Sequence, residues 1–456
     1  MKIVIVGAGS ESFGPKIIRD VYLSDELNRA GVELVLMDIV PEHLTRREKY
    51  ANTVAERMKR SPRITSTTRL DKALHSADYV ITAIERDRYL YWSQDFHVPR
   101  QYGFMQVYGE NGGPGGLFHA LRNMGPMIHI ARRMEALCPG GILLNFSNPE
   151  SKLCQAVSML TEIRAYGLCH GVSGGRRQIA SFLRVPVERL ETTACGMNHF
   201  TWFQTIRDKT TGEDLYPVLS ENERRADPLA DWDDLALSRI CLRTFGLWPS
   251  PGANHIGEYI RWAQEFLASS ALQYYYDPAT GHPWETGNVP RFVYSLSSNP
   301  TGVALFTKNA NTDGESKGSE HSGDLVDLLP SGELAVPIME ALSCGAKHEL
   351  GAVIVPNGGA IPGIDPECVV EVPAVADENG VRSVAMDPLP EAITAIVRTQ
   401  GSIQKLLVEA YADASRRKLL QAILLDPTAH SYRNAVGLIN EMCELQKDLL
   451  PALEWQ

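Results

Sequence analysis

The stretch KIVIVGAGSESF, residues 2–13, decides how the first half of this chain folds. The apolar, β-branched run KIVIV predicts a buried strand, and GAGSESFGPKIIRDVYL, residues 7–23, predicts a tight glycine turn that opens a helix. Gly7 permits the turn, and Gly9 lets the backbone approach a pyrophosphate at the N-terminus of the helix. Ser12 replaces the third glycine of the G-x-G-x-x-G fingerprint. We expect the nucleotide to contact Gly7, Gly9, Ser10, Glu11, Ser12 and Phe13.

Asp38 ends a second predicted strand, ELVLMD at residues 33–38. A carboxylate in this position accepts hydrogen bonds from ribose hydroxyls and repels a 2′-phosphate, so the sequence favours NAD over NADP. Two further strands are predicted at 78–84 and 141–146, with helices near 41–60 and 117–137. This alternation predicts an α/β fold with a Rossmann-like, doubly wound parallel sheet. For the glycine loop alone, the alternative is a helix-capping turn that binds nothing.

The pattern changes after about residue 165. AYGLCHG (165–171) and TTACGMNHFTWFQTI (192–206) are each predicted as a strand with polar groups at its end. The rest is predicted as helical segments within 205–290, a loop and helix at 321–345, a strand–loop–strand unit at 353–375, and helices after 387. We expect an NAD-binding domain over 1–195. A helix-rich α+β domain over 196–456, like the C-terminal half of lactate and malate dehydrogenases, would carry substrate, metal and oligomer contacts.

The composition is typical of a folded protein that acts on small molecules. The 456 residues suffice for two or three domains. A net charge of −11 argues against nucleic acid or an anionic membrane as the main partner. No run approaches the roughly 20 apolar residues that a membrane span needs. Gly7 and Gly9 interrupt the N-terminal apolar run, so we expect a cytoplasmic protein. Eight cysteines without a C-x-x-C pair indicate reduced thiols.

The stretch YGLCHGVSGG, residues 166–175, places Cys169 beside His170 at the end of a predicted strand. His199 ends another strand thirty residues later. A thiolate and an imidazole together suit a borderline cation such as Mn, Fe, Co, Ni or Zn. Two protein ligands are too few for structural zinc, but they suit a site where the substrate supplies further ligands. From the spacing alone, a buried cysteine and a core histidine are the simpler interpretation.

Three other segments carry candidate site residues. PSPGANHIGEYIRW (249–262) predicts a helix on which His255 and Tyr259 share a face, although a histidine there also suits a cap. Asn148 ends the fourth strand, at the sheet edge where α/β proteins bind ligands, although an Asn-Pro turn needs no ligand. The glycine-dense loop at 108–116 either closes over a ligand or is simply flexible.

Together these motifs resemble glycoside hydrolase family 4, the NAD- and metal-dependent glycosidases. The resemblance rests on GAGSESF (7–13), DFHVPRQYG (95–103), GGPGGLFHALRN (112–123), NFSNP (145–149), CHGV (169–172), GMNHF (196–200), EY (258–259) and VPNGGAIPGIDPECVVEVPA (355–374). It therefore covers most of the chain. It implies hydrolysis by elimination rather than by two carboxylates. NAD oxidises C3 of the sugar, a metal polarises the carbonyl, a base removes the C2 proton and the aglycone leaves. Water then adds at C1, and the hydride returns to C3.

The resemblance also implies roles for individual residues. Cys169 and His199 would bind Mn²⁺ or another divalent metal, and His170 would be the general acid or part of its relay. His255 occupies the place of the C2 base, which is a tyrosine or an aspartate in several members, and Tyr259 is the reserve candidate. Asn148 and Asn198 would hold sugar hydroxyls.

The resemblance extends to the substrate, because the residues after the metal cysteine follow substrate class in this family. CHGV is most similar to the α-glucuronidases, whereas α-glucosidases and α-galactosidases carry CHSV and α-galacturonidases CHEV. An anionic C6 group needs a cationic partner, for which Arg88 is our candidate, with Arg86, Arg176 and Arg177 as others. Each also fits a solvated surface arginine.

We therefore expect an α-glucuronide or another anionic hexoside as the substrate. A sulfoquinovoside or a neutral α-glucoside or α-galactoside is the alternative. Two more distant hypotheses are an NAD-dependent hydroxyacid or polyol dehydrogenase and an NAD-sensing protein. Family members tend to form dimers or tetramers, so we expect a homodimer or homotetramer.

Overall fold

The structure is a computed structural model that describes residues 1–61, 63–226, 235–266, 272–274, 293–295, 304–305 and 328–455. Its N-terminal half contains a six-stranded parallel sheet in the order β3-β2-β1-β4-β5-β6. The strands are β1 (Lys2–Val6), β2 (Glu33–Met37), β3 (Arg63–Thr67), β4 (Tyr79–Thr82), β5 (Ile142–Asn145) and β6 (Ala165–Gly167). The four strands predicted in this half are confirmed. The edge strand β3, of sequence RITST, was not predicted because it lacks an apolar run.

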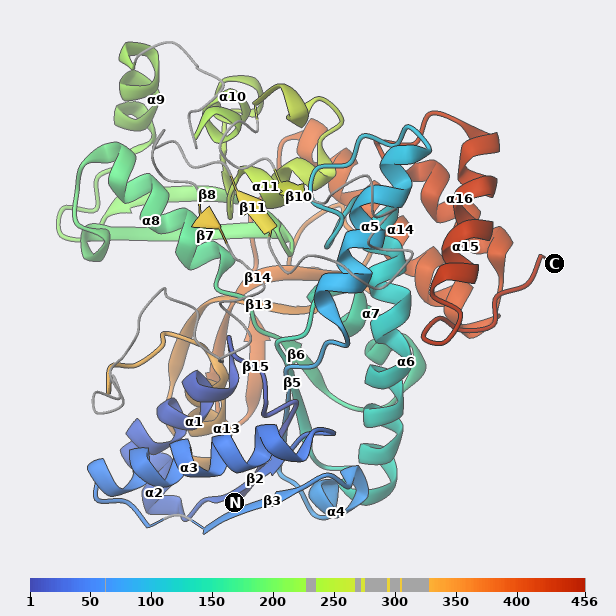
Figure 1. The fold of residues 1–456 in the computed structure, drawn as a ribbon. Coiled ribbons are helices and arrows are strands. Elements are labelled where there is room, and N and C mark those ends of the chain that lie inside the picture. Colours follow the sequence, from blue (N-terminus) through green and yellow to red (C-terminus); the bar gives the residue numbers. More distant parts are fainter. Residues whose placement is uncertain are drawn as a thin grey trace.

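Helices cover both faces of this sheet (Figure 1). Ile3 and Ile5 point to one face, which is covered by α1 (Gly14–Leu23), α3 (Pro41–Arg57) and α13 (Ala335–Cys344). Val4 and Val6 point to the other, covered by α4 (Leu70–Leu74), α6 (Gly113–Leu137) and α7 (Glu150–Leu160). Strand residues alternate between the two cores, as expected for a sheet buried on both sides. The doubly wound α/β prediction is confirmed.

The sheet does not end at β6, because five antiparallel strands continue it in the order β13-β14-β7-β8-β9. They are β7 (Leu190–Met197), β8 (Phe200–Asp208), β9 (Trp248–Ser250), β13 (His348–Pro356) and β14 (Val369–Asp377), and β15 (Gly380–Ser383) pairs with β14. The strand–loop–strand prediction for 353–375 is confirmed. The prediction of one strand over 192–206 is wrong, because β7 and β8 form a hairpin that turns at Asn198 and His199. The expected domain division after residue 195 falls inside β7.

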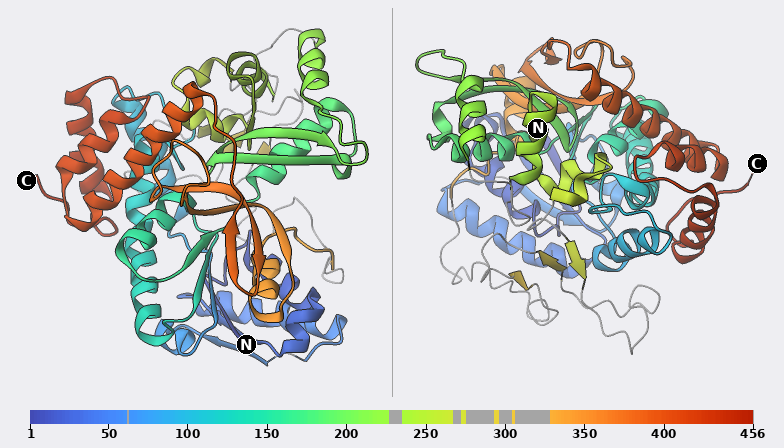
Figure 2. Two further views of the ribbon diagram at one scale, coloured as in Figure 1. Left: turned by 180° about the vertical axis from the view of Figure 1, so that it is seen from behind. Right: turned by 90° about the horizontal axis from the view of Figure 1, so that it is seen from above.

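Three C-terminal helices return to the N-terminal half (Figure 2). They are α14 (Glu391–Ala412), α15 (Arg416–Leu425) and α16 (Tyr432–Leu445), which confirms the helices predicted after residue 387. Leu407 and Leu438 join the same buried core as Leu121 of α6. The three C-terminal helices therefore pack against α6 in the first half of the chain.

Shorter elements complete the described fold. The helices are α2 (Asp25–Ala30), α5 (Arg88–Gln101), α8 (Gly171–Leu183), α9 (Tyr216–Arg225), α10 (Ala236–Phe245) and α11 (Ala253–Ile256), with 3₁₀ turns η1 (Val187–Arg189), η2 (Gly257–Tyr259) and η3 (Ala263–Phe266). A separate sheet contains β10 (Leu272–Tyr274), β11 (Val293–Ser295) and β12 (Ala304–Leu305). Other parts of the region predicted as helical at 205–290, and residues 321–327 of the predicted loop, lie outside the described residues. Within the described ranges, no helix is both long and apolar enough to cross a membrane.

Candidate active site

The glycine loop after β1 lies at the carboxyl edge of the parallel sheet. Gly7 has φ +84°, and a Cβ there would overlap the carbonyl of Ala83, so only glycine fits. The loop continues to Phe13, whose ring lies 5.1 Å from that of Phe146 beyond β5. Helix α1 begins at Gly14, later than the sequence predicts. The ends of β1, β4 and β5 thus converge on one loop, the arrangement in which this fold class binds dinucleotides.

Asp38 and Arg47 hold this loop through hydrogen bonds to its backbone. The Asp38 carboxylate accepts hydrogen bonds from the amides of Gly9 at 2.8 Å and Val40 at 3.0 Å. A carboxylate has about four acceptor positions, so Asp38 keeps capacity for ribose hydroxyls. The Arg47 guanidinium donates to the carbonyls of Ala8, Gly9 and Ser10. Glu11 forms ion pairs with Arg46 and Arg47, and Ser12 is exposed.

The structure brings Cys169 and His199 together and adds a third group, Glu150. Their ligand atoms all lie within 4.8 Å of one another, and Cys169 Sγ is 3.3 Å from His199 Nε2. Cys169 follows β6, Glu150 begins α7, and His199 occupies the β7–β8 turn with φ +63°. This left-handed conformation is strained for a histidine, and such strain concentrates at functional sites. A thiol, an imidazole and a carboxyl at one point suit a borderline divalent metal.

The three groups resist ionisation on their own. Burial, followed by the nearby Glu371, raises the pKa of Glu150 well above its usual range. Burial, followed by the nearby Glu150, raises the pKa of the Cys169 thiol. Burial lowers the pKa of His199 well below its usual range. A cation would reverse the repulsion that keeps the proton on the carboxyl and on the thiol.

His255 lies against this cluster, and Tyr259 does not share a helix face with it. The centroids of the His255 and His199 rings are 4.3 Å apart. Helix α11 ends at Ile256 and Tyr259 lies on the 3₁₀ turn that follows, so the predicted i,i+4 arrangement is wrong. The Tyr259 hydroxyl instead donates to the carbonyl of Asn198 at 3.4 Å. Burial raises the pKa of Tyr259 well above its usual range, whereas burial lowers the pKa of His255.

Several buried polar atoms around the cluster have no hydrogen-bond partner among the described residues. They are Asn148 Oδ1, Glu150 Oε2, Asn198 Oδ1, His199 Nδ1, His255 Nδ1 and Glu371 Oε1. Such atoms are costly to bury unless a ligand satisfies them. They include both asparagines that the sequence singled out. A small polar ligand and a metal therefore fit this part of the site.

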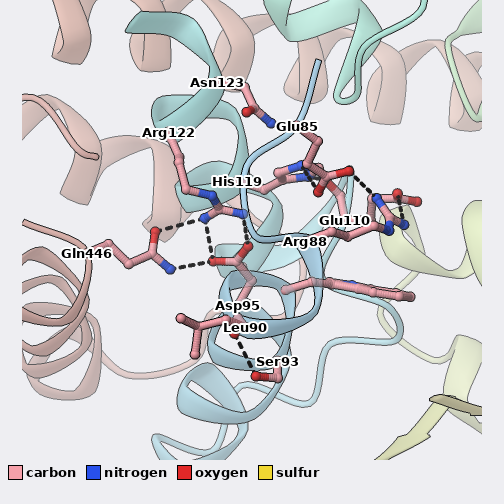
Figure 3. Close-up of polar contacts among 12 residues, drawn as sticks. Glu85, Arg88, Leu90, Ser93, Asp95, Glu110, His119, Arg122, Asn123 and Gln446 are labelled. Carbon is pink, nitrogen blue, oxygen red and sulfur yellow. Dashed lines mark hydrogen bonds and ion pairs between the residues drawn. The ribbon is translucent and has the colours of Figure 1, made fainter. Parts of the chain in front are cut away.

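Arg88 lies between two carboxylates (Figure 3). Its terminal nitrogens donate to Glu85 and to Glu110, each at 2.6 Å. Glu85 also faces the buried His119, whose Nε2 lies 3.3 Å from it. Burial alone would raise the pKa of Glu85, but Arg88 and His119 outweigh it and lower that pKa to about 2. The guanidinium of Arg88 packs over the Trp92 ring at 4.5 Å.

His170 and the other arginines lie apart from the buried cluster. The side chain of His170 is 59% exposed, and its Nδ1 lies 3.7 Å from Glu333 Oε1. Arg176 donates to the carbonyl of Val187, and Arg177 to Ser173, on α8 and its continuation.

The amino-acid sequence matches one family along almost its whole length. The profile described as "Family 4 glycosyl hydrolase" matches residues 2–185, and that of the "Family 4 glycosyl hydrolase C-terminal domain" matches residues 194–429. The chain belongs to this family. It is therefore a glycosyl hydrolase, and the predicted resemblance is confirmed.

Three similar proteins illustrate the range of this family. The glycosidase is 30% identical to an α-glucosidase of Erwinia rhapontici and 27% identical to an α-galactosidase of Bacillus subtilis, each over 99% of both chains. Its fold matches that of a 6-phospho-α-glucosidase from gut microorganisms, solved in complex with NAD and Mn²⁺, with TM-score 0.76 and 22% identity over 99% of both chains.

Sequence reasoning missed part of the glycosidase site. Glu150 follows the NFSNP motif, but a glutamate in the first turn of a helix also suits the helix dipole, so nothing marked it. Glu371 lies in β14, 173 residues after its partner Asn198, whose Nδ2 donates to it at 3.2 Å. The buried Lys152 and Glu258 were not assigned roles. The sequence shows that each is a charged residue in an otherwise apolar segment, but it does not show which residue it contacts.

Proposed function

We propose that this glycosidase cleaves α-glycosides with NAD and a divalent metal, most simply Mn²⁺. The buried Glu150–Cys169–His199 cluster, next to His255 at the carboxyl edge of a dinucleotide-binding sheet, carries the proposal. The two α-glycosidase relatives support the α linkage. The solved relative supports both cofactors, because its complex contains NAD and Mn²⁺.

Residues of the chain fit both groups. Cys169, His199 and Glu150 would hold the metal, and the loop at 7–13 with Asp38 would hold NAD. When bound, NAD exchanges a hydride with the sugar, and the metal stabilises negative charge on a sugar oxygen.

His255 is the proposed base for the C2 proton. Burial lowers its pKa, so the imidazole is neutral near pH 7 and can accept a proton. Its Nδ1 has no partner among the described residues, so this atom is available. The raised pKa of Tyr259 keeps the phenol protonated, which favours His255 over the reserve candidate.

His170 is the proposed general acid for the leaving group. His170 follows Cys169 in the chain and its side chain is exposed, so an aglycone that extends toward water could reach it. Asn148 and Asn198 are proposed to hold sugar hydroxyls, because each has a buried carbonyl oxygen without a described partner. A bound sugar hydroxyl would donate to each of them.

We propose a hexoside with an anionic C6 group, most simply an α-glucuronide, on the strength of the CHGV segment. Neutral α-glucosides and α-galactosides are the second candidate, and one observation favours them. Both terminal nitrogens of Arg88 already donate to Glu85 and Glu110. A substrate carboxylate would have to displace one of these partners to gain a bidentate contact.

The test uses purified protein with NAD, Mn²⁺ and a reducing agent. The substrates are p-nitrophenyl α-glucuronide, α-galacturonide, α-glucoside and α-galactoside, with nitrophenol and NADH followed together. We expect nitrophenol without net NADH, lost on chelation and in Cys169→Ser but retained in the control Cys443→Ser. Steady NADH without nitrophenol would show a dehydrogenase, and the preferred glycone decides between the two substrate classes.

Three coarser expectations remain part of this proposal. They are an NAD-binding unit over 1–195 followed by a substrate and metal unit over 196–456, a homodimer or homotetramer, and a cytoplasmic location.

A further inference from the structure

The glycine-dense loop at 108–116 is fixed by buried side chains rather than free to open. Its amides and carbonyls form hydrogen bonds with side chains from several other parts of the chain. Trp92 donates to the carbonyl of Tyr108 at 3.0 Å, and His119 Nδ1 lies 2.7 Å from the carbonyl of Glu110. Gly115 donates to the Gln106 side chain at 2.8 Å. An isolated lid would leave these groups to water.

Glu258 is the central partner of this loop. Its Oε1 accepts from the amides of Glu110 at 2.8 Å and Asn111 at 3.0 Å, and Oε2 accepts again from Asn111 at 3.2 Å. Gly112 packs so closely that a Cβ there would lie 2.7 Å from Glu258 Cβ. Glu258 is 1% exposed. This glycine is therefore required by the close approach of the loop to the 257–259 turn.

Lys152 and Asp426 hold the same loop as Glu258, and we call these three buried side chains the clamp. Lys152, also 1% exposed, donates to the carbonyl of Asn111 at 2.5 Å. Asp426, which ends α15, accepts from the amide of Gly113 at 3.1 Å. The two acids and the lysine lie close enough to interact electrostatically. A buried charge set of this kind is stable only while every member has a partner.

The clamped loop presents Tyr108 to the catalytic histidine. The Tyr108 ring packs edge-on against His255, with centroids 5.2 Å apart, and against Trp92 at 4.9 Å. His255 and Glu258 lie on consecutive turns of one segment. Glu258 therefore joins the segment that carries His255 to the loop that packs against it.

We propose that Glu258 and Lys152 are positioning residues that lock the 108–112 loop to the His255 segment and thereby hold His255 beside the metal cluster. This rests on the proposed role of His255 as the base. Neither residue need touch the sugar.

The test combines hydrogen–deuterium exchange with kinetics in the full-length protein with NAD and Mn²⁺. Glu258→Leu should speed amide exchange in peptides covering 108–116 and 253–260 by about tenfold or more. The value of kcat should fall by about 100-fold, because a base displaced from the proton that it removes reacts more slowly. The KM for NAD should stay the same. Glu258→Gln keeps one acceptor and should recover part of kcat.

Two further variants separate positioning from stability. Lys152→Met leaves Glu258 in place and removes the donor to the Asn111 carbonyl, so it should also speed exchange in 108–116 and lower kcat. Glu223→Gln disturbs another buried ion pair, with Arg239, and should alter neither loop exchange nor kcat. Unchanged loop exchange in Glu258→Leu, or fast exchange with wild-type kcat, would overturn the proposal. If no glycoside is cleaved by the wild type, the exchange result still tests the clamp while the proposed function fails.

Discussion

The affinity of the metal cluster should depend steeply on pH, and the steepness identifies its ligands. Burial and the neighbouring Glu371 raise the pKa of Glu150, and burial with Glu150 raises the pKa of Cys169. Both groups bind a metal as anions, so binding must displace their protons. His199 releases none, because burial keeps its pKa well below the usual range. Affinity should therefore rise as pH rises.

Each displaced proton changes the apparent affinity about tenfold per pH unit, or about 1.4 kcal/mol. Two protons predict a fall in the Kd for Mn²⁺ of about 100-fold per pH unit below the raised pKa of Glu150, in a range where an ordinary glutamate is already ionised. Above the raised pKa of Glu150, only the Cys169 proton remains to be displaced and the dependence falls to about tenfold per unit. In Glu150→Gln it should be about tenfold throughout.

The assay is calorimetric titration of Mn²⁺ in two buffers of different ionisation enthalpy, which counts protons directly. Glu223→Gln, a buried carboxylate in another part of the chain, is the control and should behave as wild type. If Glu150→Gln releases as many protons as wild type, Glu150 is not a ligand. If wild type releases none, Cys169 is not a ligand either.

Three further outcomes are expected. Asp95→Leu leaves the buried Arg122 guanidinium without the carboxylate that binds two of its nitrogens, at 2.7 and 3.1 Å (Figure 3), and should lower the free energy of unfolding by about 3–5 kcal/mol. Replacing both Asp95 and Arg122 with apolar residues should lower the free energy of unfolding by less, as measured in denaturant melts. An equal decrease in the single and the double variant would contradict this reasoning. Gly9→Ala brings a methyl group to 2.7 Å from a carboxylate oxygen and should abolish NAD binding in a fluorescence titration, whereas Gly140→Ala, in open space, should bind normally. His170→Gln should lower kcat by about 100-fold for alkyl glycosides but little for nitrophenyl ones, with Mn²⁺ affinity unchanged; an equal loss on both would exclude general-acid catalysis by His170.

The parts of the fold set by local pattern were predictable. KIVIV and the glycines after it define a strand and a tight turn in a few residues, and β1, β2, β4 and β5 each have their own apolar run. The edge strand at 63–67 was missed because its polar residues carry no such signal. The hairpin at 190–208 was missed because its turn residues, Asn198 and His199, lack the glycine that usually marks one.

The candidate site was predictable only where one motif carries the chemistry. Cys169 and His199 could be paired because each ends a strand, but the third group depends on where α7 begins relative to both. Glu258 meets the glycine loop 147 residues away, so no window of sequence contains the contact. The arrangement of buried charges is a property of the packing, and the sequence shows only that charges are present.

The place of β13 in the sheet has a consequence for synthesis of the chain. Gly167 of β6 pairs with Ile354 of β13, 187 residues later. At about 5–20 residues per second, a ribosome needs roughly 10–40 s to make that interval. During this time the open edge of the parallel sheet has no partner, and an unpaired edge is where chains associate wrongly. We therefore expect conditions that slow translation across this interval, and so leave this edge unpaired for longer, to increase aggregation of this protein.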